Sequence, residues 1–88
     1  MQVREIRLRN AKGLHARGAA RIVKVAGRFS SRVMLTVGER RANARSIMAV
    51  LMLAAAMGAT VRLETEGPDE QAAIEAVVAV LVAPGDRS

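Results

Sequence analysis

The chain contains a single histidine, His15, in the segment Asn10-Ala-Lys-Gly-Leu-His-Ala-Arg-Gly-Ala-Ala20. An alternating pattern ends in this segment and a basic helical pattern begins, so we expect His15 just before a helix N-terminus. The first backbone N–H groups of a helix have no acceptors within the helix, and they bind anions. The guanidinium of Arg17 can also bind phosphate oxygens. The segment therefore predicts a site that holds a phosphate transiently.

Phosphoryl transfer suits these residues because it needs alignment and charge compensation more than covalent help from the protein. Gly13 and Leu14, which precede His15, carry no side-chain oxygen that could cap the helix. The backbone N–H groups of Ala16 and Arg17 are therefore expected to contact a phosphate. The positive potential of the helix start and of Arg17 favours the neutral, nucleophilic imidazole over the imidazolium. His15 is the candidate nucleophile and Arg17 the candidate phosphate contact.

Composition narrows the classes of protein and site that the chain could represent. Its 88 residues predict one domain, 1–88, and the absence of cysteine excludes disulfides, thiol nucleophiles and cysteine-based zinc sites. With one histidine we expect no metal site, and we expect no cofactor. The charged N-terminus lacks the apolar region of a signal peptide, and the longest apolar run, residues 47–57, is too short to span a bilayer. We expect a cytoplasmic protein with no direct membrane insertion.

The charge is divided unevenly along the chain. Residues 1–45 hold 12 Lys and Arg against 2 Asp and Glu, whereas residues 46–88 hold 2 against 6. The basic half predicts an acidic partner for part of the surface. One alternative is a basic nucleic-acid-binding module in which His15 is incidental, although Phe29 is the sole aromatic residue available for stacking on bases. Another is an enzyme with an acid–base histidine, although neither a second histidine nor a paired-carboxylate motif stands beside His15 in the sequence.

Periodicity predicts strands and helices that alternate along the chain, in the order β-α-β-β-α-β-α. Ser46 is the expected N-cap of the second helix, whose nearly continuous apolar run should leave part of Ile47, Met48, Leu51 and Met52 exposed. Half-buried alternation in every strand favours an α+β fold in which an antiparallel sheet is covered by helices on one face. The expected strands include Ile6 and Leu8, 33–37, 40–43 and 61–66, with a turn at Gly38-Glu39; the expected helices are 16–26, 47–57 ended by Gly58, and one opened by 67–70 and ended by Pro84-Gly85.

Several motifs recur in order along nearly the whole chain: Gly13-Leu14-His15-Ala16-Arg17, then Asn43-Ala44-Arg45-Ser46-Ile47-Met48, then Gly58, then Gly67-Pro68-Asp69-Glu70. In this the sequence resembles the HPr family of phosphocarrier proteins of the phosphoenolpyruvate-dependent phosphotransferase system. The resemblance implies an HPr-like open-faced two-layer β-sandwich with strand order 1-4-2-3 under three helices. Neighbouring first and fourth strands would then place Arg7 and Arg9 opposite Glu64 and Glu66.

The resemblance also implies roles for the residues and a set of partners. His15 would accept a phosphoryl group from phosphorylated Enzyme I and pass it to an EIIA-type acceptor, in sugar transport or in a regulatory, nitrogen-related branch. Ser46 would be a regulatory site for an HPr kinase/phosphorylase, and the protein would be a monomer. The implied partner-binding residues are Arg17, Arg21, Lys24, Ile47, Met48 and Leu51, with Arg45 at their basic rim.

Two positions depart from the family pattern. Gly18 stands where the family commonly has a proline, and glycine leaves the first helical turn less preorganised. Lys12 stands where relatives often have a small polar residue that can cap the helix. Neither change removes the nucleophile, so we expect them to affect the rate of transfer and the branch of the family.

Overall fold

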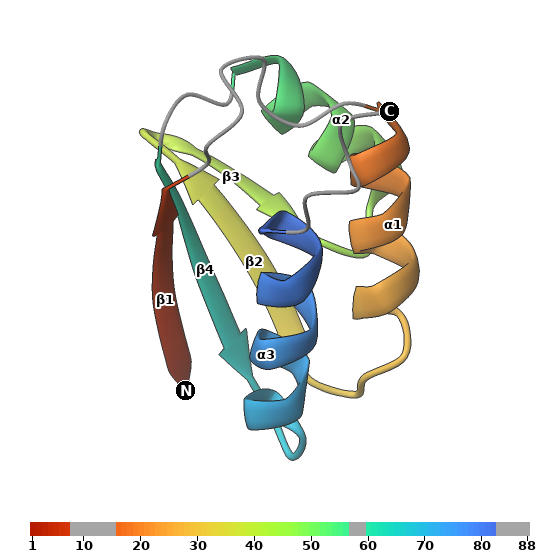
Figure 1. The fold of residues 1–88 in the computed structure, drawn as a ribbon, viewed down its shortest axis with the longest axis vertical. Helices are drawn as coiled ribbons and strands as arrows, with labels where there is room; N and C mark the ends of the chain where they lie inside the picture. The colour runs from red at the N-terminus through yellow and green to blue at the C-terminus, as the bar shows by residue number, and fades with distance from the viewer. Residues whose placement is uncertain (8–15, 57–59, 83–88) are drawn as a thin grey trace.

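The computed structural model describes residues 1–7, 16–56 and 60–82, and in these ranges it contains four strands and three helices (Figure 1). Their order is the predicted β-α-β-β-α-β-α. The elements are β1 (Gln2–Arg7), α1 (Ala16–Ala26), β2 (Arg32–Val37), β3 (Arg40–Asn43), α2 (Ile47–Ala56), β4 (Thr60–Glu66) and α3 (Glu70–Leu81).

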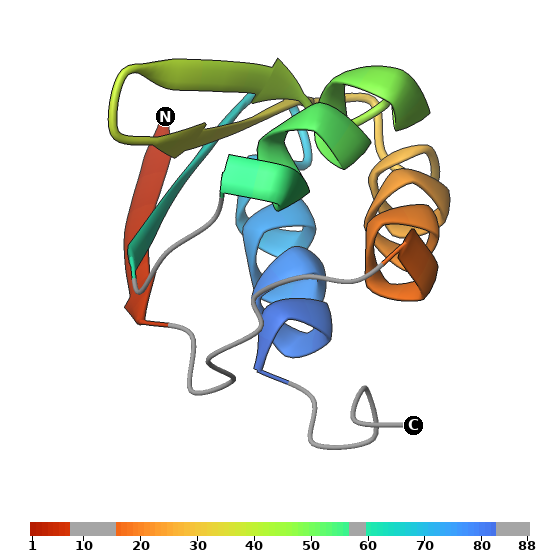
Figure 2. The same cartoon turned by 90° about the horizontal axis from the view of Figure 1, so that it is seen from above.

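The four strands form one antiparallel sheet in the order β1-β4-β2-β3. Figures 1 and 2 show the three helices on one face of this twisted sheet and the other face left open. The predicted two-layer α+β architecture and strand order are therefore confirmed. Alternation explains which side chains face the helices, because successive residues of a strand point to opposite faces. The inward residues Val33, Leu35, Val61 and Leu63 are fully buried.

The β2–β3 hairpin closes through the predicted Gly38-Glu39 turn. Val37 lies opposite Arg40, so two residues connect the strands. Gly38 has a φ of +61°, and no non-glycine residue among those described has a positive φ. A positive φ at the first central position alone is the pattern of a type II′ turn, whose twist matches that of the strands on either side.

The expected pairing of Arg7 and Arg9 with Glu64 and Glu66 is wrong where the structure describes it. Arg7 lies opposite Thr60, and Glu64 lies opposite Val3. Antiparallel strands place the end of one beside the start of the other, so the end of β1 cannot face the acidic end of β4. Arg9 lies outside the described residues.

Small side chains let the helices approach one another over the sheet. α1 contacts both α2 and α3. Its buried face consists of Ala19, Ile22 and Ala26, and α3 buries Ala73 on its own inner face. Alanines at these positions allow close helix packing in a core where Phe29 is only partly buried. The core thereby holds α1 in a defined position.

Some expected boundaries fall outside the described residues, namely Leu8, the stop at Gly58 and the Pro84-Gly85 terminator. Within the described ranges, α2 ends at Ala56 and α3 ends at Leu81. No helix in the part of the chain that the structure describes is long and apolar enough to cross a membrane.

Candidate functional site

Helix α1 begins at Ala16, one residue after His15 in the sequence, which is where the sequence predicts a helix start. His15 itself lies outside the described residues, and so does the side chain of Arg17. The backbone of Arg17 belongs to the first turn of α1, together with a buried Gly18. The departure from the family pattern at Gly18 thus lies in a turn whose backbone packs against the protein.

The outer face of α1 is basic, as its sequence predicts. Arg21 and Lys24 are exposed, whereas Ile22 and Ala26 on the other side are fully buried. The first turn of this helix carries no acidic residue. The positive end of the helix dipole and these cations therefore act with the same sign.

Helix α2 presents an apolar patch, which we define as Ile47, Met48, Leu51 and Met52. Ile47, Met48 and Met52 are 40%, 66% and 64% exposed, and Leu51 is half-buried. The opposite side of α2 buries Val50 and Leu53, because a helix over a sheet can bury only one stripe. The expectation that some of this run stays exposed is confirmed.

The apolar patch and the start of α1 lie at the same end of the molecule (Figure 1). α1 and α2 are also in contact, so the basic face and the apolar patch belong to adjoining helices. Of the predicted partner-binding set, Arg21 and Lys24 thus lie on the helix next to the one that carries Ile47, Met48 and Leu51. The structure adds Met52, which is far more exposed than Leu51 and was not in that set.

Ser46 caps α2, as predicted. The backbone N–H of Ala49 donates to Ser46 Oγ at 3.3 Å, and the N–H of Val50 donates to the Ser46 carbonyl at 3.0 Å. Asn43 shapes the approach to this cap, because its side-chain oxygen accepts from the backbone N–H of Arg45 at 2.9 Å. Ser46 is exposed, so its hydroxyl is accessible as well as being part of the cap.

Comparison with known proteins decides the family. A protein-family model, described as the phosphorylation site of the HPr component of the phosphotransferase system, matches residues 2–83. The chain belongs to the HPr family. It is 47% identical over 81 residues to the phosphocarrier protein HPr of Cupriavidus necator, covering 92% of this chain and 91% of that protein.

Other members of the HPr family agree in sequence and fold. The phosphocarrier protein NPr of Shewanella violacea is 35% identical over 97% of this chain and 93% of its own length. A crystal structure of HPr-C-His from Thermoanaerobacter tengcongensis superposes with a TM-score of 0.82 at 40% identity, covering 92% of this chain and 91% of that one. These similarities support a phosphocarrier of the phosphotransferase system and give no support to the nucleic-acid-binding alternative. Proteins of the family interact with enzymes of that system.

The sequence did not predict a polar clamp that holds the loop between α1 and β2. The Asp69 carboxylate accepts from the backbone N–H groups of Ser30 and Ser31, each at 2.9 Å, and from the Ser31 hydroxyl. Ser31 Oγ accepts in turn from the Asp69 N–H at 3.1 Å. The backbone carbonyls of the same loop are also bound, because the Arg45 guanidinium donates to Phe29 O and Ser31 O. We call this set the loop clamp.

The loop clamp engages two charged residues, Asp69 and Arg45, through contacts that the sequence did not predict. Hydrogen bonds from the Ser31 hydroxyl and from the Ser30 and Ser31 backbone lower the pKa of Asp69. Arg45, which the sequence places at the basic rim, instead engages backbone carbonyls. The partners are 14 to 39 residues apart in the chain, so periodicity could not reveal them. Asp69 is the N-cap residue of α3, but its carboxylate makes no capping hydrogen bond there.

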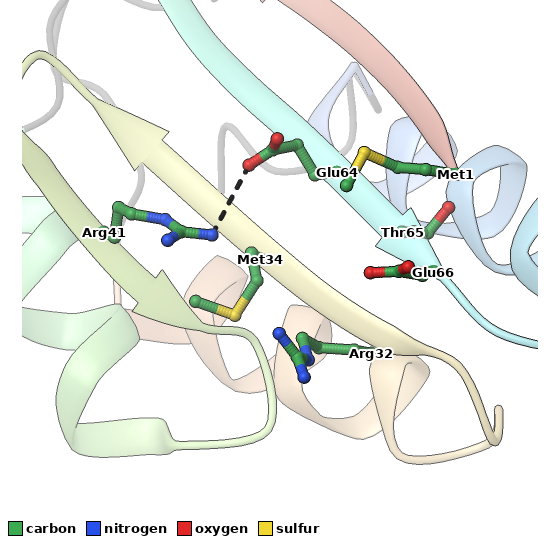
Figure 3. Close-up of a pocket in the computed structure, with 7 residues that line it drawn as sticks. All are labelled: Met1, Arg32, Met34, Arg41, Glu64, Thr65 and Glu66. Carbon is green, nitrogen blue, oxygen red and sulfur yellow. Dashed lines mark ion pairs between the residues drawn. The ribbon is translucent and has the colours of Figure 1, made fainter.

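A shallow hollow of about 30 Å³ lies on the open face of the sheet, away from the helices (Figure 3). Glu64, which lines it, lies 3.6 Å from the guanidinium of Arg41, another lining residue, and 3.7 Å from that of Arg62, so the charges on this face offset one another. In the described ranges, no cluster of His, Cys, Asp or Glu side chains is grouped to hold a metal ion. The hollow is lined by Met1, Arg32, Met34, Arg41, Glu64, Thr65 and Glu66.

Proposed function

We propose that His15 accepts a phosphoryl group from phosphorylated Enzyme I and passes it to an acceptor of the EIIA type. A ring nitrogen of His15 attacks the phosphorus, the bond to the donor breaks, and an N–P bond forms on His15. In the second transfer, the acceptor attacks the same phosphorus and His15 becomes the leaving group. The observation that carries the proposal is the start of α1 at Ala16, directly after His15 in the sequence.

The helix supplies what phosphoryl transfer requires of a protein. Ala16 and Arg17 are the first residues of α1, so their backbone N–H groups have no acceptor within the helix and can donate to phosphate oxygens. Arg17 adds a guanidinium whose fork geometry suits phosphate. The buried residues Ala19 and Ile22 hold α1 against the core, so these donors are positioned before the phosphate arrives.

Docking of Enzyme I and EIIA-type acceptors is assigned to the apolar patch on α2 and the basic face of α1. Exposed methionines make adaptable apolar contacts, which suits a surface that binds more than one partner. Arg21 and Lys24 are exposed on the adjoining helix α1 and add positive charge that steers acidic partners. Relatives named HPr and NPr are both similar to this chain, so the branch is tested by offering the phosphorylated protein an EIIA protein of each kind.

The direct test of the relay is labelling from radioactive phosphoenolpyruvate in the presence of Enzyme I. The expected result is acid-labile, base-stable label on the intact protein and none on His15→Ala. Arg17→Ala should still be labelled, but more slowly. The matched control is Arg7→Ala, which removes an exposed arginine from β1, on the sheet and not on the helices, and should be labelled at the normal rate. Equal labelling of His15→Ala and intact protein would overturn the assignment.

Ser46 is proposed as a regulatory phosphorylation site for an HPr kinase/phosphorylase. Its exposed hydroxyl at the N-terminus of α2 supports this, because a phosphate there is compatible with the helix dipole. The new negative charge would lie next to the apolar patch and oppose docking of acidic partners. Incubation with the kinase and labelled ATP should label the intact protein and Ser30→Ala but not Ser46→Ala. Label that persists on Ser46→Ala would overturn this assignment.

A further inference from the structure

Met48 and Met52 place two sulfur atoms at the surface of α2. They are four residues apart on the helix, and their side chains are 66% and 64% exposed. Residues at this spacing lie on the same face, one turn apart. The chain has no cysteine, so its five methionines carry all of its sulfur. An oxidant that would normally react first with a thiol must here react with a thioether.

We propose that Met48 and Met52 form a reversible oxidation site that switches off partner docking on α2. The proposal rests on the docking role assigned above to the apolar patch. It extends that role by making the patch sensitive to peroxides or hypochlorous acid, whatever the state of His15 and Ser46.

The chemistry balances with hydrogen peroxide as the oxidant and with the thiols of a sulfoxide reductase as the reductant. A thioether sulfur attacks one oxygen of hydrogen peroxide, the O–O bond breaks, an S–O bond forms and water leaves. The sulfur loses two electrons, and the peroxide is reduced. In the reverse direction, a methionine sulfoxide reductase returns the oxygen as water while two thiols are oxidised to a disulfide. Both directions need access to the sulfur, which the exposure of Met48 and Met52 provides.

Oxidation would change the property on which docking depends. A sulfoxide is polar, and its oxygen must be hydrogen-bonded if a partner buries it. Ile47 and Leu51 would remain apolar, but both are less exposed than the two methionines. Oxidation of Met48 and Met52 therefore removes the more accessible part of the patch from apolar contact.

Two other methionines separate oxidation from its effect on docking. Met1 is 65% exposed, so it should react as readily as Met48. Met1 and the half-buried Met34 both line the hollow on the open side of the sheet (Figure 3). Sulfoxide at Met1 should therefore leave docking unchanged, and Met34 should react more slowly than either.

The test compares the intact protein, Met48→Leu/Met52→Leu and the control Met34→Leu before and after graded hydrogen peroxide. Leucine keeps the apolar volume and removes the sulfur. Peptide mass spectrometry locates the sulfoxides, labelling by Enzyme I gives the transfer rate, and titration with Enzyme I gives binding. We expect oxidation to lower kcat/KM for labelling by Enzyme I by about tenfold in the intact protein and in Met34→Leu. The reason is the loss of apolar contacts with Enzyme I at the oxidised methionines. The double leucine variant should keep its rate, and a sulfoxide reductase with dithiothreitol should restore the others.

Each outcome tests either the oxidation site or the docking role on which it rests. Equal losses in the double leucine variant and the intact protein would assign the damage to other methionines and overturn the inference. So would an unchanged rate in protein that carries sulfoxide at both positions. Untreated protein that takes no label and binds no Enzyme I would instead overturn the proposed function, and the inference would fall with it.

Discussion

Ser46 connects a single side chain to the stability of a whole helix. Its Oγ accepts from the Ala49 N–H at 3.3 Å, one of the N–H groups that have no partner within the helix. Ser46→Ala should lower the free energy of unfolding by about 1 kcal/mol, and Ser46→Asp should preserve it. Ser30→Ala is the matched control, because the Ser30 hydrogen bond to Asp69 uses its backbone N–H. Urea unfolding gives the values; equal losses in Ser46→Ala and Ser30→Ala would refute a capping role.

Asp69 should make the stability depend on pH. Its pKa is lowered in the folded protein, chiefly by the Ser31 hydroxyl and the Ser30 N–H. A lowered carboxyl pKa contributes stability above the unfolded value of about 4, and this stability is lost as the pH falls through the folded pKa. Asp69→Asn should therefore be less stable than the intact protein at neutral pH and should show a weaker acid dependence.

Thermal unfolding between neutral pH and about pH 2, below the usual carboxyl pKa, measures that acid dependence. Glu39→Gln, in the exposed β2–β3 turn, is the control and should follow the intact protein. If the stability of Asp69→Asn and of the intact protein changed in parallel over the whole range, the loop clamp would not depend on the charge of Asp69.

At the scale of elements, two glycines end or join strands for different reasons. Gly67, after β4, has a φ of +149°, and a Cβ there would lie 2.6 Å from Ser31 Oγ and 2.7 Å from Ser31 Cα. Gly38 also has a positive φ, but a Cβ there would meet nothing within 4 Å. Gly38→Ala should cost about 1 to 2 kcal/mol through backbone strain alone. Gly67→Ala should cost more, because β4 and the loop clamp must also move apart.

Chemical denaturation of the two alanine variants checks this order. The comparison is internal, since both substitutions add one methyl group at a positive φ and both lie outside helices. A Gly67→Ala variant as stable as Gly38→Ala would mean that the contact with Ser31 relaxes without cost.

What the sequence could predict depends on how far apart the interacting residues are. The strands, the start of α1 at Ala16, the opening of α3 by 67–70, the Gly38 turn and the Ser46 cap all follow from periodicity or local hydrogen bonding, and the structure agrees. The expected position of Arg7 opposite Glu64 was wrong because register is set by pairing between distant strands. The loop clamp was missed for the same reason. Local hydrogen bonding could thus be predicted from the residues and the strand order from the family resemblance, whereas the strand register and the loop clamp could not.

The same distinction between local and non-local contacts applies to the residues of the candidate site. Exposure of Met48 follows from an apolar run longer than one buried stripe, which the sequence alone reveals. The hydrogen bonds from Arg45 to the carbonyls of Phe29 and Ser31 depend on how α1, β2 and α2 meet. The sequence alone therefore could not distinguish Arg45 from the exposed cations of α1. His15 stays a prediction from its motif, because it lies outside the described residues.

At the scale of the whole molecule, the fold sorts charge onto two faces. The outer face of α1 is basic, whereas the open face of the sheet alternates in sign. There Glu5 lies opposite Arg62, and Glu66 lies opposite Arg32. Opposite charges across neighbouring strands offset each other at a distance, but like charges on one helix face do not. The attraction of an acidic partner should therefore come from the helical side.

Two charge reversals test this division. Lys24→Glu on α1 and Arg7→Glu on β1 each replace a +1 charge by a −1 charge, so either variant takes the net charge from +6 to +4. If only net charge matters, both should slow phosphorylation by Enzyme I equally. If the basic face steers docking, Lys24→Glu should lower kcat/KM by about tenfold at low salt, whereas Arg7→Glu should keep a kcat/KM near that of the intact protein.

Because salt screens this attraction, the difference between the two variants should shrink as ionic strength rises from about 0.01 to 1 M. A difference between the variants that persists at high salt would indicate a direct contact at Lys24, and equal slowing would assign the steering to the molecule's total charge.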